Sequence, residues 1–202
     1  MATASTTANL FGEQSPFPDG FRYEERFLSA DEEAALLEQI RALPLEQAQY
    51  RQFTARRRIV SFGGRYDFTH HELLPAQSMP EWLRPLRDRA AAWAGLSGDQ
   101  IDHALVAEYA PGTPLGWHRD VPDFEAIVGV SLAGPCRMRF RRYPPAKPGR
   151  AELVLDVALR SIYTMQGAAR WKWQHSVSPT KELRYSITFR TRRGSGGRGL
   201  GA

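Results

Sequence analysis

The chain has 202 residues, 42% hydrophobic and 24% charged, a balance typical of one globular domain with a sizeable core. Cys136 is the only cysteine, which excludes an intramolecular disulfide framework and a multi-cysteine zinc site and fits a reducing compartment. The net charge of +5 is compatible with a polyanionic partner such as nucleic acid. The sequence shows no apolar run of membrane-spanning length and no secretory signal pattern at its start, so we expect a cytoplasmic monomer without a membrane partner.

Both ends of the chain are rich in small and polar residues. We therefore expect a flexible tail over residues 1–16 and a second, glycine-rich tail over residues 194–202. The composition between them predicts a single domain over residues 17–193.

Two helices are expected in the first half of the domain. Ser29 and Glu32 have the spacing of a capping box, and the apolar residues that follow recur on one face of a helix that Pro44 closes. A second helical pattern runs from about residue 81 to residue 94, with Pro85 tolerated in the first turn. Both helices are expected to serve as scaffold.

From Asp102 onward the pattern changes to short segments of alternating, β-branched or aromatic residues separated by Gly and Pro. The candidate strands are HALVAEYA, AIVGVSL, CRMRFRRY, ELVLDV, SIYTM, WKWQHSV and LRYSITFRT. Without helical patterns between them, these segments indicate an antiparallel sandwich or barrel of the jelly-roll kind. The predicted fold is α+β, with a jelly-roll core over about residues 100–192 and the N-terminal helices packed on one sheet.

The stretch PLGWHRDVPDF places His118 and Asp120 two positions apart, so in a strand both side chains would share one face. His175, on a later candidate strand, could meet this pair in an antiparallel sandwich. Two histidines and one carboxylate form a facial triad, which leaves three positions on iron(II) open. The remaining histidines, His70, His71 and His103, are not expected to be ligands.

The segment RYSITFR follows nine residues after His175 and places Arg184, Ser186, Thr188 and Arg190 on one strand face. Arginines on the inner face of a sandwich are costly to bury unless each meets an anion. A dicarboxylate that chelates the metal would supply this anion, because guanidinium groups bind carboxylates through paired hydrogen bonds. The alternative is an edge strand with both arginines in water.

Together, EYAPGTPLGWHRD, His175 and RYSITFR resemble the AlkB-like Fe(II)/2-oxoglutarate-dependent dioxygenases, in the same order, over roughly residues 100–192. The resemblance implies iron(II), 2-oxoglutarate and O2 as cofactors. The residues that it implies for the site are His118, Asp120 and His175 as iron ligands and catalytic residues, and Tyr109, Arg184, Ser186 and Arg190 around 2-oxoglutarate. Arg184 would hold the distal carboxylate, and Arg190 would lie near the chelating end.

The sequence departs from the family pattern at three places. Ser186 and Ala107 stand where asparagine is usual, which thins the polar network around the co-substrate. Val121 and Pro122 follow the HRD motif where DNA-repair members carry acidic residues that help read the damaged base. Dioxygenase chemistry is therefore better supported than base recognition.

The segment of residues 53–74 resembles the substrate-covering region that precedes the barrel in this family. Its aromatic residues Phe62, Tyr66 and Phe68 could form a stacking surface, and its arginines could contact phosphates, as base-flipping enzymes require. The candidate substrate-binding residues are Arg56, Arg57, Arg58, Phe62, Tyr66 and Trp117. The alternative is that the aromatic residues pack inward and the arginines are solvated.

Three function classes remain open at this point. The favoured one is oxidative demethylation of N-alkylated bases in DNA or RNA, which releases formaldehyde from a hydroxylated methyl group. The second is hydroxylation or demethylation of a protein or a small molecule. The third is a zinc-dependent hydrolase with the same His, Asp, His set, against which the paired arginines and the lack of a general-base glutamate in the ligand motifs both argue.

Overall fold

The computed structural model describes residues 16–50, 53–67, 72–146 and 151–194. Nearly all of both predicted tails lies outside these residues, so the tails stay predictions. Within the described residues no helix is both long and apolar enough to span a membrane.

The two predicted helices are present. In α1 (Ala30–Arg41) the capping box is formed, with the Glu32 amide donating to Ser29 Oγ at 3.1 Å and the Ser29 amide donating to Glu32 Oε2 at 2.7 Å. The second helical segment begins as the 3₁₀ turn η1 (Glu81–Leu83) and continues as α2 (Arg84–Trp93), which has Pro85 in its first turn. A short 3₁₀ turn, η2 (Gly98–Gln100), leads into the sheets.

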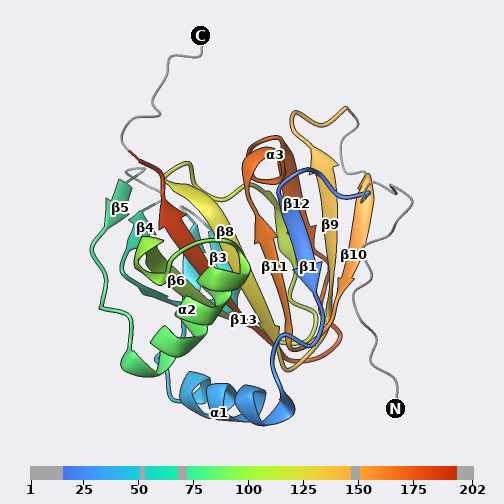
Figure 1. Ribbon diagram of the computed structural model, residues 1–202. Helices are drawn as coiled ribbons and strands as arrows, with labels where there is room; N and C mark the ends of the chain where they lie inside the picture. The colour runs from blue at the N-terminus through green and yellow to red at the C-terminus, as the bar shows by residue number, and fades with distance from the viewer. Residues whose placement is uncertain (1–15, 51–52, 68–71, 147–150, 195–202) are drawn as a thin grey trace, which may run out of the picture.

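Two antiparallel sheets form the body of the molecule (Figure 1). The major sheet has the order β1-β11-β8-β13-β6-β3-β2, with β1 (Phe21–Glu24), β11 (Ser161–Met165), β8 (Phe124–Leu132), β13 (Arg184–Arg192), β6 (Ile101–Tyr109), β3 (Phe53–Phe62) and β2 (Glu46–Tyr50). The minor sheet has the order β10-β9-β12-β7, with β10 (Leu153–Val157), β9 (Cys136–Arg142), β12 (Trp173–Val177) and β7 (Leu115–His118). A separate hairpin joins β4 (Arg65–Asp67) to β5 (Glu72–Leu74). This arrangement confirms the predicted jelly roll.

Two of the differences between the structure and the expected elements concern the site. Residues 53–74 were expected to cover the substrate, but part of this segment is β3, a strand of the major sheet that pairs with β6. The candidate strand WKWQHSV is divided, because Trp171 ends the short helix α3 (Gly167–Trp171) and only the following residues form β12.

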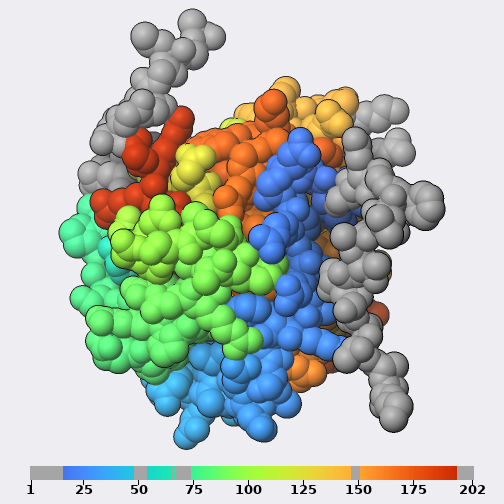
Figure 2. All heavy atoms as spheres, in the orientation of Figure 1, coloured from blue at the N-terminus to red at the C-terminus, as the bar shows by residue number. Residues whose placement is uncertain are grey.

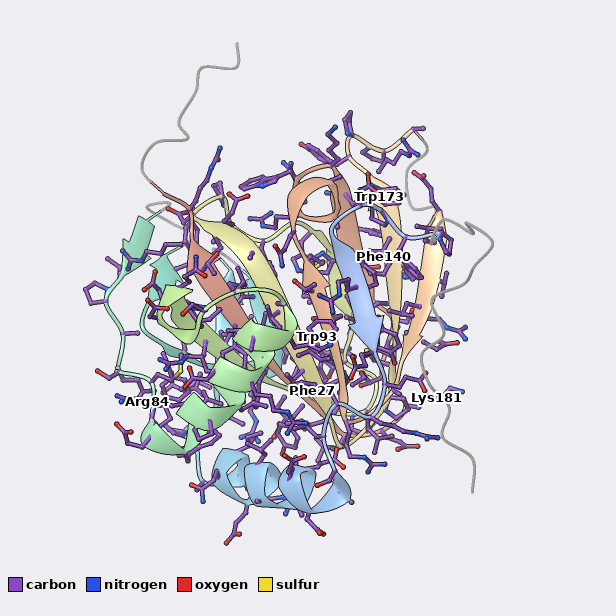
Figure 3. The ribbon with its side chains drawn as sticks, viewed as in Figure 1. Phe27, Arg84, Trp93, Phe140, Trp173 and Lys181 are labelled. Carbon is purple, nitrogen blue, oxygen red and sulfur yellow. The ribbon has the colours of Figure 1, made fainter. Side chains whose placement is uncertain are left out.

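Two hydrophobic cores hold these layers together. One lies between the major sheet and the helices, and the other lies between the two sheets. Figure 3 shows Phe27 and Trp93 on the side covered by α2, with ring centroids 6.4 Å apart, and Phe140 and Trp173 on the side of β9 and β12. In Figure 2 the segments around α1 and α2, in blue and green, cover much of the visible face.

Candidate active site

A cavity of about 570 Å³ lies between the inner faces of the two sheets. This volume falls in the usual range for small-molecule sites. The predicted site residues that line it are Arg56, Arg57, Tyr66, Tyr109, Trp117, His118, Asp120, His175, Arg184, Ser186 and Arg190. Residues from distant parts of the sequence therefore meet in one cavity.

His118 and His175 are brought together by strand pairing. They are direct partners in the antiparallel register of β7 and β12, and their ring centroids are 4.2 Å apart. His118 Nδ1 lies 2.8 Å from the carbonyl oxygen of Gly116. Because a carbonyl only accepts, Nδ1 carries the proton and Nε2 keeps its lone pair, which is the state that a metal ligand needs.

Asp120 lines the cavity, but it does not lie on a strand as predicted. The strand β7 ends at His118, so Asp120 lies in the following loop rather than on the strand face. Arg170 of α3 holds this loop, since its guanidinium donates to the carbonyl oxygens of Asp120 at 3.1 Å and of Val121 at 2.7 Å. Arg170 is 3% exposed, and no sequence motif marked it for this role.

The charges in the cavity follow from burial. Desolvation lowers the pKa of His118 and lowers the pKa of His175 to about 3, so both rings are neutral at pH 7. Burial would raise the pKa of Asp120, but the positive charge of Arg190 holds it below its usual range. The three groups are thus in the protonation states in which they bind metals.

His118, Asp120 and His175 are side chains of the kinds that bind iron(II). Their donor atoms, however, do not converge on one point in this structure. Within the described part of the chain, no three histidine, cysteine or acidic side chains are arranged to hold a metal ion. Asp120 Oδ1 instead contacts Arg190 Nη2 at 3.3 Å. The carboxylate of Asp120 is thus paired with Arg190.

Arg184 lies on β13, which is a central strand between β8 and β6, so the alternative of a solvated edge strand is wrong. Its side chain is 1% exposed, Nε donates to Ser131 Oγ at 3.0 Å, and the guanidinium lies 5.0 Å from the ring centre of Tyr109. Among the described residues it has no acidic partner. A buried cation without a counter-charge is costly, which indicates a site for an anion.

Arg190 contacts two other residues of the cavity. Its Nη2 contacts Asp120, its Nη1 lies 3.3 Å from His103 Nδ1, and its buried Nε has no hydrogen-bond partner. Because a guanidinium only donates, His103 Nδ1 must accept, and the other ring nitrogen donates to the backbone of Gly64. The unpartnered Nε is available to a bound carboxylate.

His103 was not predicted to have a role beside Arg190. It is 5% exposed and its ring packs 4.7 Å from that of Phe124. The signal was present in the sequence, since His103 lies six residues before Tyr109 and therefore shares its strand face. The prediction that His103 is not a ligand is consistent with its contact to Arg190.

The candidate substrate-binding residues within residues 53–74 do not all reach the cavity. Arg57, which is 8% exposed, and Arg56 line the cavity with Tyr66. Phe62 does not: it is 2% exposed and belongs to the core beneath the helices, so its prediction as a stacking residue is wrong. Arg58 faces away from the cavity and forms a bidentate ion pair with a glutamate.

That glutamate is Glu108, which accepts from Arg58 Nε at 2.8 Å and from Arg58 Nη2 at 2.7 Å. Glu108 also accepts from the hydroxyl of Tyr185. The charge of Arg58 is therefore balanced by Glu108, which argues against the predicted phosphate contact. Phe68, His70 and His71 lie outside the described residues.

Comparison with known proteins agrees with this fold. The chain matches the 2OG-Fe(II) oxygenase superfamily over residues 20–190. It is 27% identical over 187 residues to "Uncharacterized protein L905" of Acanthamoeba polyphaga mimivirus, covering 85% of this chain and 84% of that one.

Two further relatives are longer than this chain. The "Alkylated DNA repair protein ALKBH8 homolog" of Arabidopsis thaliana is 30% identical over 118 residues, which cover 49% of this chain and 34% of that protein. The "Probable RNA/DNA demethylase ALKBH6" of Danio rerio is 28% identical over 117 residues, which cover 58% and 47% respectively. The matched region is thus less than half of each relative.

Solved structures share the fold at low identity. The structure of OsALKBH1 superposes with a TM-score of 0.70 at 17% identity and covers 86% of this chain and 97% of that chain. A Pseudomonas putida prolyl-4-hydroxylase superposes with a TM-score of 0.58, also at 17% identity, and covers 87% and 94%.

Proposed function

Because the chain belongs to the 2OG-Fe(II) oxygenase superfamily and is similar to AlkB homologues, we propose that the cavity is its active site and that alkylated nucleic acid is its substrate. The enzyme is a dioxygenase that uses iron(II), 2-oxoglutarate and O2. The observation that carries the assignment is the buried, uncompensated guanidinium of Arg184, in the same cavity as the His118–His175 pair.

In this proposal His118, Asp120 and His175 hold iron(II), which supplies the activation of O2 coupled to conversion of 2-oxoglutarate to succinate. Arg184 binds the distal carboxylate of 2-oxoglutarate, and Tyr109 beside it completes that end of the site. Arg190 lies near the metal-chelating end and offers its free Nε.

The chain's own contribution is positioning and exclusion of water. Arg170 fixes the loop that carries Asp120, and the Gly116 carbonyl fixes the tautomer of His118. Val121 and Phe124 close the cavity with apolar surface beside these polar groups. The co-substrate therefore meets one oriented set of donors rather than a solvated one.

For the substrate we propose an N-alkylated base in single-stranded or locally opened DNA or RNA. Arg56, Arg57 and Tyr66 line the same cavity and place cations and an aromatic ring where a flipped nucleotide would enter. The net charge of +5 supports the same substrate, as do the names of the two longer relatives, which describe alkylated DNA repair and RNA/DNA demethylation.

A protein or small-molecule substrate is the second candidate. The specific observation that favours it is Val121, which lines the cavity and is followed by Pro122. Acidic side chains that could hydrogen-bond a base are replaced there by apolar ones.

The test is formaldehyde release from methylated single-stranded oligonucleotides, measured together with succinate. We expect equal amounts of both products from the native enzyme and neither from His175→Ala, which removes one metal ligand. Succinate without formaldehyde from any methylated DNA or RNA would refute the nucleic-acid substrate and favour the second candidate.

A further inference from the structure

The outer face of the minor sheet carries a row of arginines on β9. Alternate residues of this strand, Cys136, Met138 and Phe140, point into the core between the sheets. The intervening residues Arg137, Arg139 and Arg141 therefore lie on the opposite, outer face. Figure 1 shows β9 between β10 and β12, at the side of the molecule away from α1 and α2.

Arg139 and Arg141 are held in place by neutral groups. Arg139 Nε donates to Ser176 Oγ at 3.1 Å, and Arg141 Nε donates to the Gln174 side-chain oxygen at 2.9 Å. Both guanidinium groups also lie over the indole ring of Trp117, at 5.2 and 4.4 Å from its centre. Neither arginine has an acidic partner in the described part of the chain.

Arg137, on the same strand face, is different. Its guanidinium forms a bidentate ion pair with Asp156 on β10, at 2.7 and 3.1 Å. Its charge is therefore already balanced. On this face of β9, within the described residues, Arg139 and Arg141 differ from Arg137 because no carboxylate balances their positive charge.

Trp117 connects this face to the active site. It lies on the edge strand β7, directly before His118, and it also lines the cavity together with Arg56 and Arg57. The surface formed by Trp117, Arg139 and Arg141, called here the Arg–Trp–Arg surface, therefore begins at the rim of the cavity.

We propose that the Arg–Trp–Arg surface binds the phosphate backbone of the nucleic-acid strand whose alkylated base enters the cavity; this rests on the proposed function. The guanidinium groups are pre-oriented by the indole and by the neutral acceptors, so binding a phosphate costs little side-chain entropy. Two residues apart on a strand, they are about 6.6 Å from each other along it, similar to the spacing of successive phosphates in an extended strand. The contacts would be independent of base sequence.

The test compares the double variant Arg139→Gln, Arg141→Gln with the matched control Arg137→Gln. Binding to a methylated single-stranded 15-mer is measured as a function of salt. Because each lost phosphate contact removes about 0.7 from the log–log salt slope for single strands, the double variant should lower the slope by about 1.4. Arg137→Gln should leave both slope and affinity unchanged, and thermal unfolding should show both variants folded.

Two further outcomes separate this inference from the proposed function. If the native enzyme binds and demethylates the 15-mer but the double variant binds it with the same slope, only the Arg–Trp–Arg surface is refuted. If the native enzyme neither binds nor demethylates any oligonucleotide, the proposed function fails first. A loss in Arg137→Gln equal to that of the double variant, or equal competition by polyglutamate, would also overturn the assignment to a nucleic-acid strand.

Discussion

At the scale of single residues, the cavity depends on charges that the fold buries without balancing. Arg184 is almost fully buried, and the side chains that it contacts, Tyr109 and Ser131, carry no carboxylate to balance its charge. Arg190 has one buried nitrogen without a partner. Both features are unfavourable in the ligand-free protein and become favourable when an anion binds.

Arg184→Lys should sharply weaken 2-oxoglutarate binding, because an ammonium group cannot reproduce the planar, bidentate contact. Loss of one partner of a buried charge pair predicts a weakening of about 2 to 5 kcal/mol. The measurement is the apparent affinity for 2-oxoglutarate by calorimetry. Arg58→Lys, on the opposite face of the same sheet, is the control and should bind as the native protein does; an unaltered affinity in Arg184→Lys would remove this residue from the site.

His103→Phe should raise the KM for 2-oxoglutarate, because Arg190 Nη1 would lose its acceptor. An unsatisfied buried donor costs about 1 to 3 kcal/mol, and we expect Arg190 to shift from its position to reduce this cost. His103→Gln restores an acceptor oxygen and should recover part of the effect. If Phe and Gln variants had the same KM as the native enzyme, the contact would have no role in positioning Arg190.

The site residues that could be predicted from the sequence all lie in short local patterns, either the alternation of one strand or a sequence motif. Arg184, Ser186 and Arg190 were placed on one strand face by period-two alternation, Tyr109 was implied by the family resemblance, and all four line the cavity. Arg170 could not be predicted, because its role depends on where α3 meets the loop after β7. Contacts between distant elements leave no periodic signal in a single sequence.

At the scale of elements, β3 decides which parts of the substrate segment reach the cavity. Its residues Arg57 and Ile59 face the cavity, whereas Val60 and Phe62 face the helix-covered core. Because residues 53–74 were interpreted as a cover over the substrate and not as a strand, this alternation was not considered. Phe62 was therefore assigned to the wrong face. The strands β1 and β2 were also missed, since both are short edge strands with weak patterns.

The turn after β3 depends on Gly63. At φ +79, a Cβ on this residue would lie 1.9 Å from the carbonyl oxygen of Asp102, at the start of β6. Gly63→Ala should therefore cost more than the roughly 1 to 2 kcal/mol of left-handed strain alone, and it should loosen the neighbouring Gly64–His103 contact. Chemical denaturation gives the change in unfolding free energy.

Gly95→Ala is the matched control for this prediction. Gly95 has a similar φ of +75, but nothing lies within 4 Å of its added Cβ. The loss of unfolding free energy in Gly95→Ala should therefore reflect the left-handed strain alone. Equal destabilisation by the two substitutions would mean that the turn moves freely from β6, contrary to the close packing described above.

At the scale of the whole molecule, burial of neutral histidines makes the stability of the metal-free protein depend on pH. Desolvation lowers the pKa of both His103 and His175 to about 3, below the ordinary value near 6.5. Between these values the unfolded chain binds protons that the folded chain does not. Stability is therefore full above pH 6.5 and should fall as the pH decreases toward 3, by up to about 1.4 kcal/mol per pH unit for each histidine.

Urea denaturation with a metal chelator present checks this dependence between pH 7 and pH 4. His103→Gln removes one of the two groups and should make the curve less steep. A native curve that stays flat over this range would show that the histidines are solvated rather than buried.

The central claim is that one cavity holds the metal and the dicarboxylate together. The most direct measurement is calorimetric binding of 2-oxoglutarate without oxygen, with and without iron(II), in the native protein and in His175→Ala. Because the two ligands would contact each other, iron(II) should strengthen 2-oxoglutarate binding to the native protein, and this coupling should vanish in His175→Ala. Equal affinity with and without iron(II) in the native protein would contradict the account.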